Sequence, residues 1–234
     1  SINPDDYTAG FPMHPHRGIE TISYVSRGKM VHRDSLGNEA GISDGEVQWM
    51  NSGSGIMHEE MVPAAERLLG VQLWLNLPAK DKMSKPSYNS IKNEDIKEIE
   101  IEGGKIRLLA GKYGEHEGYK GDYLSMDYYD IHLNADAEVT LTMEEDDSVM
   151  VFTLLGDVYI DGEHIEEKTA VKLTEGDSLT IKNGNEKAQV LYMNSRALNE
   201  PVAWAGPIVM NTQEELQKAF LELRSNTFIK ETAE

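Results

Sequence analysis

The chain has 234 residues, of which 39% are hydrophobic, so it can form one large domain or two small ones. It has no cysteine, which excludes disulfides and thiolate metal sites, fits a reducing environment and leads us to expect a cytoplasmic protein. A formal net charge of −19 and the lack of a long apolar run lead us to expect neither direct nucleic-acid binding nor contact with a membrane.

The first half of the chain alternates short β-prone runs with turn residues, which is the pattern of antiparallel strands. His32 lies on the second of the expected strands, where we expect a partly exposed side chain without a ligand role. The glycines of segment 51–55 allow the backbone to bend sharply before His58. The expected strands are residues 21–25, 30–34 and 47–50, with turns at 27–28, 35–38 and 44–45.

Two histidine-containing segments bracket this region. One residue separates His14 from His16, and one residue separates His58 from Glu60. Because alternate side chains of a strand share a face, each pair can point into a barrel. Imidazole nitrogens combined with a carboxylate oxygen suit iron, manganese, nickel, copper or zinc. We therefore expect the two segments to meet in space and to hold one metal ion.

The carboxylate ligand is ambiguous from spacing alone. Glu20 lies four residues after His16, and H-x-H-x3-E is the spacing of the first motif of many cupin barrels. The run from Gly55 to His58 resembles the end of the second cupin motif, and by that pattern Glu20 is the ligand. Strand alternation admits either Glu20 or Glu60.

Residues 67–77 form the clearest strand of the sequence. One face, which we expect to be core, carries Leu69, Val71, Leu73, Leu75 and Leu77. Trp74 lies on the other face, where we expect a packed core side chain, with a place in the wall of the pocket as the alternative. Residues 78–91 break the pattern with prolines and lysines. We expect this segment to be a linker between domains, or a loop that covers the first barrel.

The second half repeats the rhythm of short strands and turns without the paired ligands. Its histidines, His116, His132 and His164, are isolated, so we expect ordinary surface or core roles for them. Many short strands at this spacing are typical of a barrel or sandwich. The second half begins at residues 98–109, and the expected strands follow at 124–132, 138–143, 148–160, 170–173, 178–181 and 188–193.

One helix is expected, at residues 212–225. Thr212 and Glu215 have the spacing of a capping box, and an apolar stripe at helical spacing follows. We expect this stripe to pack on a barrel, with a partner-binding helix as the alternative. The stripe consists of Leu216, Ala219, Phe220 and Leu223.

Several longer runs resemble the pirin family of bicupins over nearly the whole chain. The runs that carry this resemblance are residues 11–21, 48–50, 55–61, 72–78 and 206–212. The resemblance implies an all-β fold of two cupin (jelly-roll-like) barrels with the C-terminal helix packed on them. We expect a metal-binding domain at 1–97 that lacks the first strands of the family, a domain without metal ligands at 98–200, and a C-terminal segment at 201–234 that folds back on the barrels.

The resemblance also resolves the ligand set. It implies that His14, His16, His58 and Glu60 bind the metal. Glu20 then becomes a structural group, which we expect to pair with Arg17 or with a backbone amide.

For function, the resemblance implies a dioxygenase that opens the central ring of flavonols such as quercetin with O2 and releases carbon monoxide. Glu60 would act as the general base, and the apolar barrel walls would accept a small planar aromatic substrate. We expect Fe(II) as the metal, with zinc, manganese, nickel, cobalt or copper as alternatives.

Two other functions stay open at this point. The chain could be an iron-dependent, redox-sensing regulator that binds a protein partner, with Arg17 at the mouth of the site carrying the change. It could also be a cupin enzyme that acts on another small phenolic substrate. Neither spacing nor composition separates these functions from flavonol cleavage.

Overall fold

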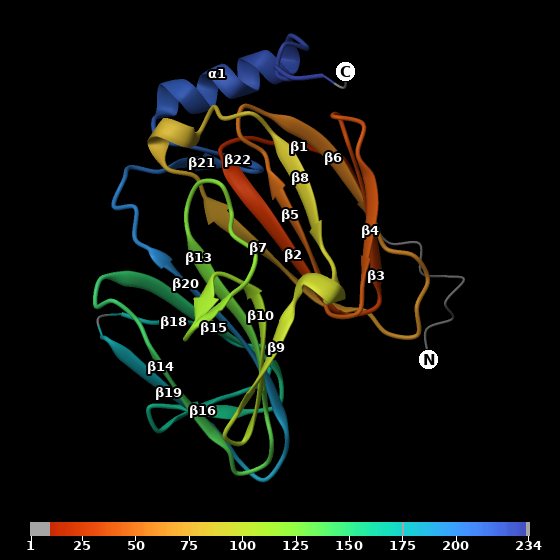
Figure 1. The fold of residues 1–234 in the computed structure, drawn as a ribbon. Helices are drawn as coiled ribbons and strands as arrows, with labels where there is room; N and C mark the ends of the chain where they lie inside the picture. The colour runs from red at the N-terminus through yellow and green to blue at the C-terminus, as the bar shows by residue number, and fades with distance from the viewer. Residues whose placement is uncertain (1–9, 175, 233–234) are drawn as a thin grey trace. The chain divides into compact units, whose positions relative to one another are not determined.

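The computed structural model describes residues 10–174 and 176–232, and the chain divides into two compact units (Figure 1). Unit 1 comprises Ser1–Asn93 together with Asn199–Glu234, and unit 2 comprises Glu94–Leu198. The C-terminal segment therefore belongs to the same unit as the two histidine-containing segments. Both units are built from antiparallel strands, and the one α-helix of the described residues lies in unit 1.

Unit 1 contains two four-stranded antiparallel sheets and a short C-terminal hairpin, with strand orders β1-β6-β3-β4, β7-β2-β5-β8 and β21-β22. The expected strands at 21–25, 30–34 and 47–50 are confirmed as parts of β2, β3 and β5. The strands of unit 1 are β1 (Gly10–His16), β2 (Ile19–Arg27), β3 (Lys29–Asp34), β4 (Glu39–Ser43), β5 (Glu46–Asn51), β6 (Ile56–Met61), β7 (Leu69–Asn76), β8 (Ser87–Ile91), β21 (Ala203–Ala205) and β22 (Ile208–Met210).

The expectation that residues 78–91 form a linker or a covering loop is wrong for the second part of this segment. Residues 79–81 form a 3-10 helix, η2 (Ala79–Asp81), and β8 then pairs with β5 as an edge strand of the second sheet. A second 3-10 helix, η3 (Asn93–Asp95), follows at the boundary between the units. Polar residues dominate β8, which is why its sequence does not read as a strand.

The C-terminal helix α1 (Gln213–Arg224) is confirmed, with its capping box intact. The Thr212 side chain accepts a hydrogen bond from the Glu215 backbone, and the Glu215 carboxylate accepts one from the backbone of Thr212. The helix buries Leu216 and Ala219, and with Phe228 these side chains share one apolar cluster with β21 and β22. This packing uses the predicted stripe to fix the C-terminal segment within unit 1.

Lys82 joins three parts of unit 1 from a buried position. Its ammonium group donates to the carbonyl oxygen of Gly18 at 2.7 Å, to that of Val209 at 2.9 Å, and to the side-chain oxygen of Asn76. Burial lowers the pKa of Lys82 to about 8, so the amine is charged at neutral pH and carries three hydrogens for three acceptors. These bonds connect the start of β2, the end of β7 and β22.

Unit 2 contains a six-stranded sheet in the order β18-β15-β20-β13-β10-β9 and a four-stranded sheet in the order β14-β19-β16-β17. A short pair, β11-β12, completes the unit. Its strands are β9 (Lys97–Ile101), β10 (Gly104–Ala110), β11 (Lys112–Tyr113), β12 (His116–Glu117), β13 (Met126–Leu133), β14 (Glu138–Thr142), β15 (Asp147–Leu155), β16 (Val158–Ile160), β17 (Glu163–Ile165), β18 (Ala170–Lys172), β19 (Ser178–Asn183) and β20 (Ala188–Arg196).

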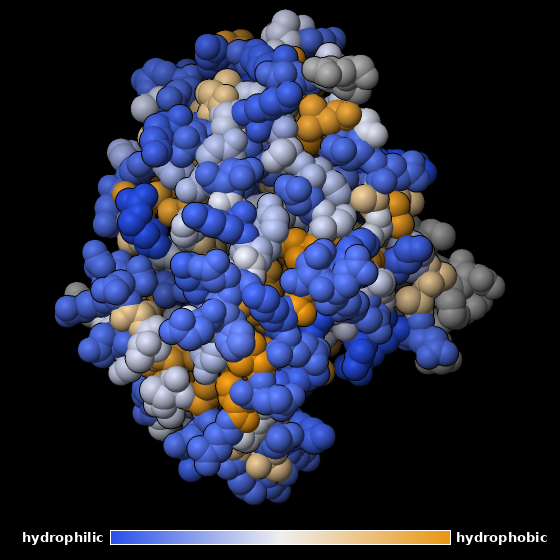
Figure 2. Space-filling model, viewed as in Figure 1, coloured by the Kyte–Doolittle hydropathy of each residue, from blue (hydrophilic) through white to orange (hydrophobic). Residues whose placement is uncertain are grey.

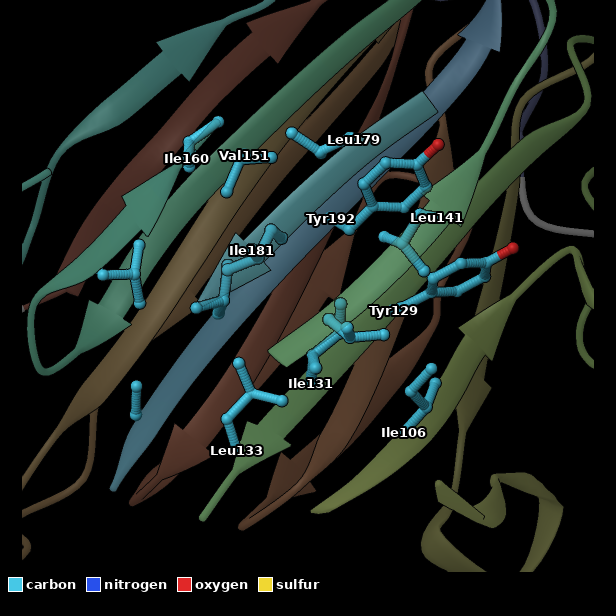
Figure 3. Packing of buried hydrophobic residues seen from close by; sticks show 14 of the residues in the cluster. Ile106, Tyr129, Ile131, Leu133, Leu141, Val151, Ile160, Leu179, Ile181 and Tyr192 are labelled. Atoms are coloured by element: carbon cyan, nitrogen blue, oxygen red, sulfur yellow. The ribbon is translucent and has the colours of Figure 1, made fainter. Parts of the chain in front are cut away.

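Apolar side chains from both sheets fill the interior of unit 2 (Figure 3). Ile131 and Val151 project from the larger sheet, and Leu141 and Ile181 project from the smaller one. The run expected as one strand at 148–160 divides into β15 and β16, because Gly156 adopts a positive φ of 75° between them. The other strands expected in this half are present within a few residues.

The surface agrees with the acidic composition. On the face drawn in Figure 2, hydrophilic side chains predominate and apolar ones form small separate groups. No helix in the described part of the chain is long and apolar enough to cross a membrane.

We predict that Lys82→Met lowers the free energy of unfolding of unit 1 by about 3 kcal/mol, because three buried acceptors lose their donor. All three tryptophans, Trp49, Trp74 and Trp204, lie in unit 1, so urea denaturation followed by tryptophan fluorescence reports on this unit. Exposed Lys80 provides the control, since Lys80→Met removes a lysine of the same segment without these bonds. Equal midpoints for the two variants would show that Lys82 does not stabilise the unit.

Candidate metal centre

The register of β1 against β6 brings the two histidine-containing segments together. His14 lies directly opposite His58, and His16 lies opposite Ile56. One ring nitrogen from each of His14, His16 and His58 lies within 4.8 Å of the other two, and the Nε2 atoms of His14 and His16 are 3.2 Å apart. The meeting of three imidazoles that the sequence predicts is therefore present.

Backbone carbonyls hold the outer nitrogens of two of these rings. His14 Nδ1 lies 2.8 Å from the Pro12 carbonyl oxygen, and His16 Nδ1 lies 3.0 Å from that of Pro207. A carbonyl only accepts, so each Nδ1 carries the hydrogen and each Nε2 keeps its lone pair. Both lone pairs are then available on the nitrogens that face each other.

His58 is fully buried, and its Nε2 has no hydrogen-bond partner. Its Nδ1 lies 3.4 Å from Nδ1 of His32, and Nε2 of His32 lies 2.8 Å from the Asp34 carboxylate. The expectation that His32 is partly exposed is wrong, because β3 pairs with β6 on the side away from β1 and so points His32 into the interior. A buried nitrogen without a partner is costly unless a ligand occupies it.

Burial also keeps two of these rings neutral. Together with a smaller effect of the neighbouring imidazoles, it lowers the pKa of His16 to about 4 and that of His58 to about 2. Burial alone would raise the pKa of Asp34, but hydrogen bonds from His32 and Asn38 outweigh it and hold that pKa below its ordinary value. Three converging imidazole nitrogens, two of them on rings that burial keeps neutral, fit a transition-metal ion.

Glu60 lies on the same buried face of β6 as His58. Its carboxylate accepts hydrogen bonds from Nε2 of Gln48 at 2.8 Å and of Gln72 at 2.9 Å, and from the Ser23 hydroxyl at 3.3 Å. The group of converging ligand atoms found among the described residues contains the three histidines and not Glu60. Metal ligation by Glu60 therefore stays a prediction.

An apolar cavity of about 250 Å³ reaches the donors that hold Glu60. Ser23 and Gln72 contribute to its wall, and the remaining wall is mostly apolar. The apolar lining side chains are Phe11, Tyr24, Val25, Met30, Val62, Leu68 and Val71. A ligand in this cavity would meet the polar groups that support the Glu60 carboxylate.

Trp74 lies beside the histidines instead of in the core. It is 39% exposed, so the expectation of a packed side chain is wrong. Its ring meets that of His16 edge-on, with 5.2 Å between the centroids, and its indole nitrogen donates to the Gln72 side chain at 3.1 Å. An exposed indole at this position offers a flat apolar surface next to the site.

Arg17 does not lie at the mouth of the site. It is buried, and it donates to the Ser54 carbonyl at 2.8 Å, to the Phe228 carbonyl at 3.0 Å and to the Glu222 carboxylate at 2.7 Å. The expected pairing of Arg17 with Glu20 is therefore wrong, and Glu20 accepts a hydrogen bond from the Trp49 indole at 3.0 Å. Arg17 anchors the C-terminal segment to the strand that follows the ligands.

The histidines of unit 2 form no comparable group. His132 pairs with Asp130 at 2.8 Å and His164 with Asp157 at 3.0 Å, and His116 is exposed on β12. Within the part of the chain that the structure describes, the cluster in unit 1 is the one group of three potential ligands.

Comparison with known proteins agrees with this geometry. The family model for pirin matches residues 1–75, and the model for the pirin C-terminal cupin domain matches residues 128–229. The chain belongs to the pirin family. Pirin from Homo sapiens is 36% identical over 92% of this chain and 77% of its own length.

Two other relatives carry the name of an enzyme. A protein of Thermoplasma acidophilum named "Putative quercetin 2,3-dioxygenase" is 36% identical over 98% of this chain and 96% of its own length. A crystal structure of quercetin 2,3-dioxygenase from Acinetobacter baumannii superposes with a TM-score of 0.88 and is 33% identical, covering 97% of this chain and 81% of that one. The bicupin fold expected from the sequence is thus confirmed.

Sequence reasoning missed the residues that support the ligands, namely His32, Asp34, Gln48 and Gln72. A signal is present for three of them, because His32, Asp34 and Gln48 are buried on their strands with a polar side chain where an apolar one would be usual, whereas Gln72 is exposed. An inward polar residue on a strand next to a ligand strand is a candidate support for that ligand.

We predict that the metal-free protein loses stability as the pH falls from 7 to 5. His16 and His58 take up protons near pH 6.5 in the unfolded chain but stay neutral in the folded protein until about pH 4 and 2. Each ring then lowers the free energy of unfolding by about 1.4 kcal/mol per pH unit below pH 6. Urea denaturation at several pH values checks this, and His58→Gln should show a shallower slope. An identical slope in the variant would contradict a neutral buried His58.

Proposed function

We propose that this protein is a metal-dependent dioxygenase that opens the central ring of flavonols such as quercetin with O2 and releases carbon monoxide. The observation that carries the proposal is the combination of three converging imidazole nitrogens, a buried carboxylate and an apolar cavity whose wall includes Ser23 and Gln72, two hydrogen-bond donors of that carboxylate. The names of the relatives supply the substrate class. The combination suits an oxidisable aromatic ligand bound beside a metal.

His14, His16 and His58 would hold the metal through their Nε2 atoms, with Glu60 as the proposed fourth ligand. When bound, a divalent ion, for which we propose Fe(II) with zinc, manganese, nickel, cobalt or copper as alternatives, supplies Lewis acidity toward a substrate oxygen and, if redox-active, a path for electrons to O2. The hydrogen bonds of His14 and His16 to carbonyls keep their lone pairs aimed inward before any ligand arrives.

Glu60 is the proposed general base. A flavonol must lose the proton of its ring hydroxyl before the ring can react with O2, and a buried carboxylate next to the cavity can take that proton. The amides of Gln48 and Gln72 donate to Glu60 and so fix the orientation of its oxygens. Trp74 and the apolar side chains of the cavity accept the flat rings and exclude water.

We predict flavonol turnover by the protein reconstituted anaerobically with Fe(II), then given quercetin and air. The flavonol absorbance should decline and carbon monoxide should be released, and neither should occur with metal-free protein or His14→Ala. His164→Ala is the matched control, since His164 is an exposed histidine of unit 2 and its variant should keep full activity. If iron, manganese, nickel and copper all bind but none supports flavonol loss, this substrate class is wrong, and another phenolic substrate or redox-dependent binding of a protein partner should be tested.

We predict that Glu60→Gln lowers kcat for quercetin by about 10²- to 10⁴-fold, because the proton acceptor is lost. Metal content of the purified variant, measured by atomic emission, separates this effect from loss of the ion. A variant that retains metal and wild-type kcat would exclude Glu60 as the base.

A further inference from the structure

We propose that His32 and Asp34 are positioning residues that set the hydrogen on His58 so that its Nε2 lone pair faces the metal. This inference rests on the metal site proposed above but not on the identity of the substrate. The side chains of His32 and Asp34 are fully buried. His32 lies next to His58 of the site, and Asp34 lies next to His32.

The hydrogen-bond pattern fixes one arrangement of protons along this chain of groups. The Asp34 carboxylate accepts only, so Nε2 of His32, 2.8 Å away, carries a hydrogen. In the neutral ring, Nδ1 of His32 is then an acceptor, and it lies 3.4 Å from Nδ1 of His58. His58 must therefore carry its hydrogen on Nδ1, which leaves Nε2 as the bare nitrogen.

Asp34 is itself held in place from several sides. It accepts hydrogen bonds from the backbone nitrogens of Leu36 and Asn38, at 2.9 and 3.1 Å, and from the Asn38 side chain at 2.9 Å. Four donors, with His32, leave the carboxylate little freedom to rotate. The turn that follows β3 thus holds Asp34, and Asp34 in turn holds the ring of His32, two residues earlier on the strand.

His32 is fixed as firmly as Asp34. Its ring stacks on that of Tyr88, with centroids 4.2 Å apart and planes at 17°. The Tyr88 hydroxyl donates to Gln48, whose amide holds Glu60, so the supports of His58 and Glu60 meet at one aromatic stack. Each of the three histidines in the cluster thus has an acceptor for its outer nitrogen. For His14 and His16 the acceptor is a backbone carbonyl, and for His58 it is the ring of His32, which is itself bonded to a carboxylate.

The test replaces His32 by phenylalanine, which keeps the stack on Tyr88 and removes both nitrogens. Long-range ¹⁵N–¹H NMR of the metal-free protein should find the hydrogen of His58 on Nδ1 in the wild type and on Nε2 in His32→Phe. Titration with Co(II), followed by its visible absorption, should show a Kd raised about 10- to 100-fold in the variant. Both readouts are independent of substrate, so a failure of the flavonol assay would leave them unaffected.

Unit 2 offers a matched control. His132 and Asp130 form a pair of the same length, 2.8 Å, two residues apart on one strand, but outside the metal cluster. His132→Phe should leave both the tautomer of His58 and the Kd for Co(II) unchanged. A similar loss of affinity in the control would assign the effect to general destabilisation and overturn the proposal.

Two results for His32→Phe would also overturn it: an unchanged Kd, or a raised Kd with the hydrogen of His58 still on Nδ1. If this variant does not fold, Asp34→Asn decides in its place. An asparagine can donate to His32 and reverse the chain of hydrogens, so we expect mixed tautomers of His58 and a Kd raised about tenfold. A wild-type tautomer and Kd in Asp34→Asn would then refute the role.

Discussion

The structure of the site depends on the antiparallel register of three neighbouring strands. Pairing of β1 with β6 sets His14 opposite His58, and pairing of β6 with β3 sets Asp34 opposite His58 and His32 opposite Glu60. A shift by one residue would turn every one of these side chains to the other face of its strand. The register thus determines the ligand cluster and its supports together, and the irregularity in β1 between Phe11 and His14 lies just before the first ligand.

The clustering of His14, His16 and His58 could be predicted from sequence because each segment carries its own periodicity. His14 and His16 share a strand face whatever lies beside them, and a second segment with the same spacing is rarely accidental. His32 could not be predicted in this way. Its exposure depends on which strand lies next to β3, and the local sequence does not say that β6 is that strand. The same limit explains Trp74, which shares a strand face with Gln72 and whose contact with His16 depends on the neighbouring strands.

Edge strands and long-range ion pairs could not be predicted, because no local sequence pattern indicates them. β4 and β8 lie at the edges of their sheets and are short and polar, so their patterns resemble loops. Arg17 pairs with Glu222, more than 200 positions away in the sequence, and no local pattern indicates such a partner. What could be predicted is the fold class, the strands with strong alternation, the capped helix and the three converging histidines.

The two barrels differ in the side chains that fill their interiors. In unit 2 the interior positions carry mostly isoleucine, leucine and valine, which stabilise the fold by burial. In unit 1 the corresponding space holds His58, Glu60 and Gln48, whose burial costs free energy unless each is hydrogen-bonded or bound to a ligand.

The C-terminal segment adds to the stabilisation of unit 1, whose core also contains buried apolar side chains such as Ile22, Val47 and Ile56. This segment accepts hydrogen bonds from His16 at Pro207, from Arg17 at Glu222 and Phe228, and from Lys82 at Val209. Three of these contacts involve His16, Arg17 or the adjoining Gly18, so the chain returns after unit 2 to the point where β1 turns into β2. On this view the polar groups inside unit 1 and the segment that packs on it belong together, because the buried His58, Glu60 and Gln48 occupy interior positions of a kind that apolar side chains fill in unit 2.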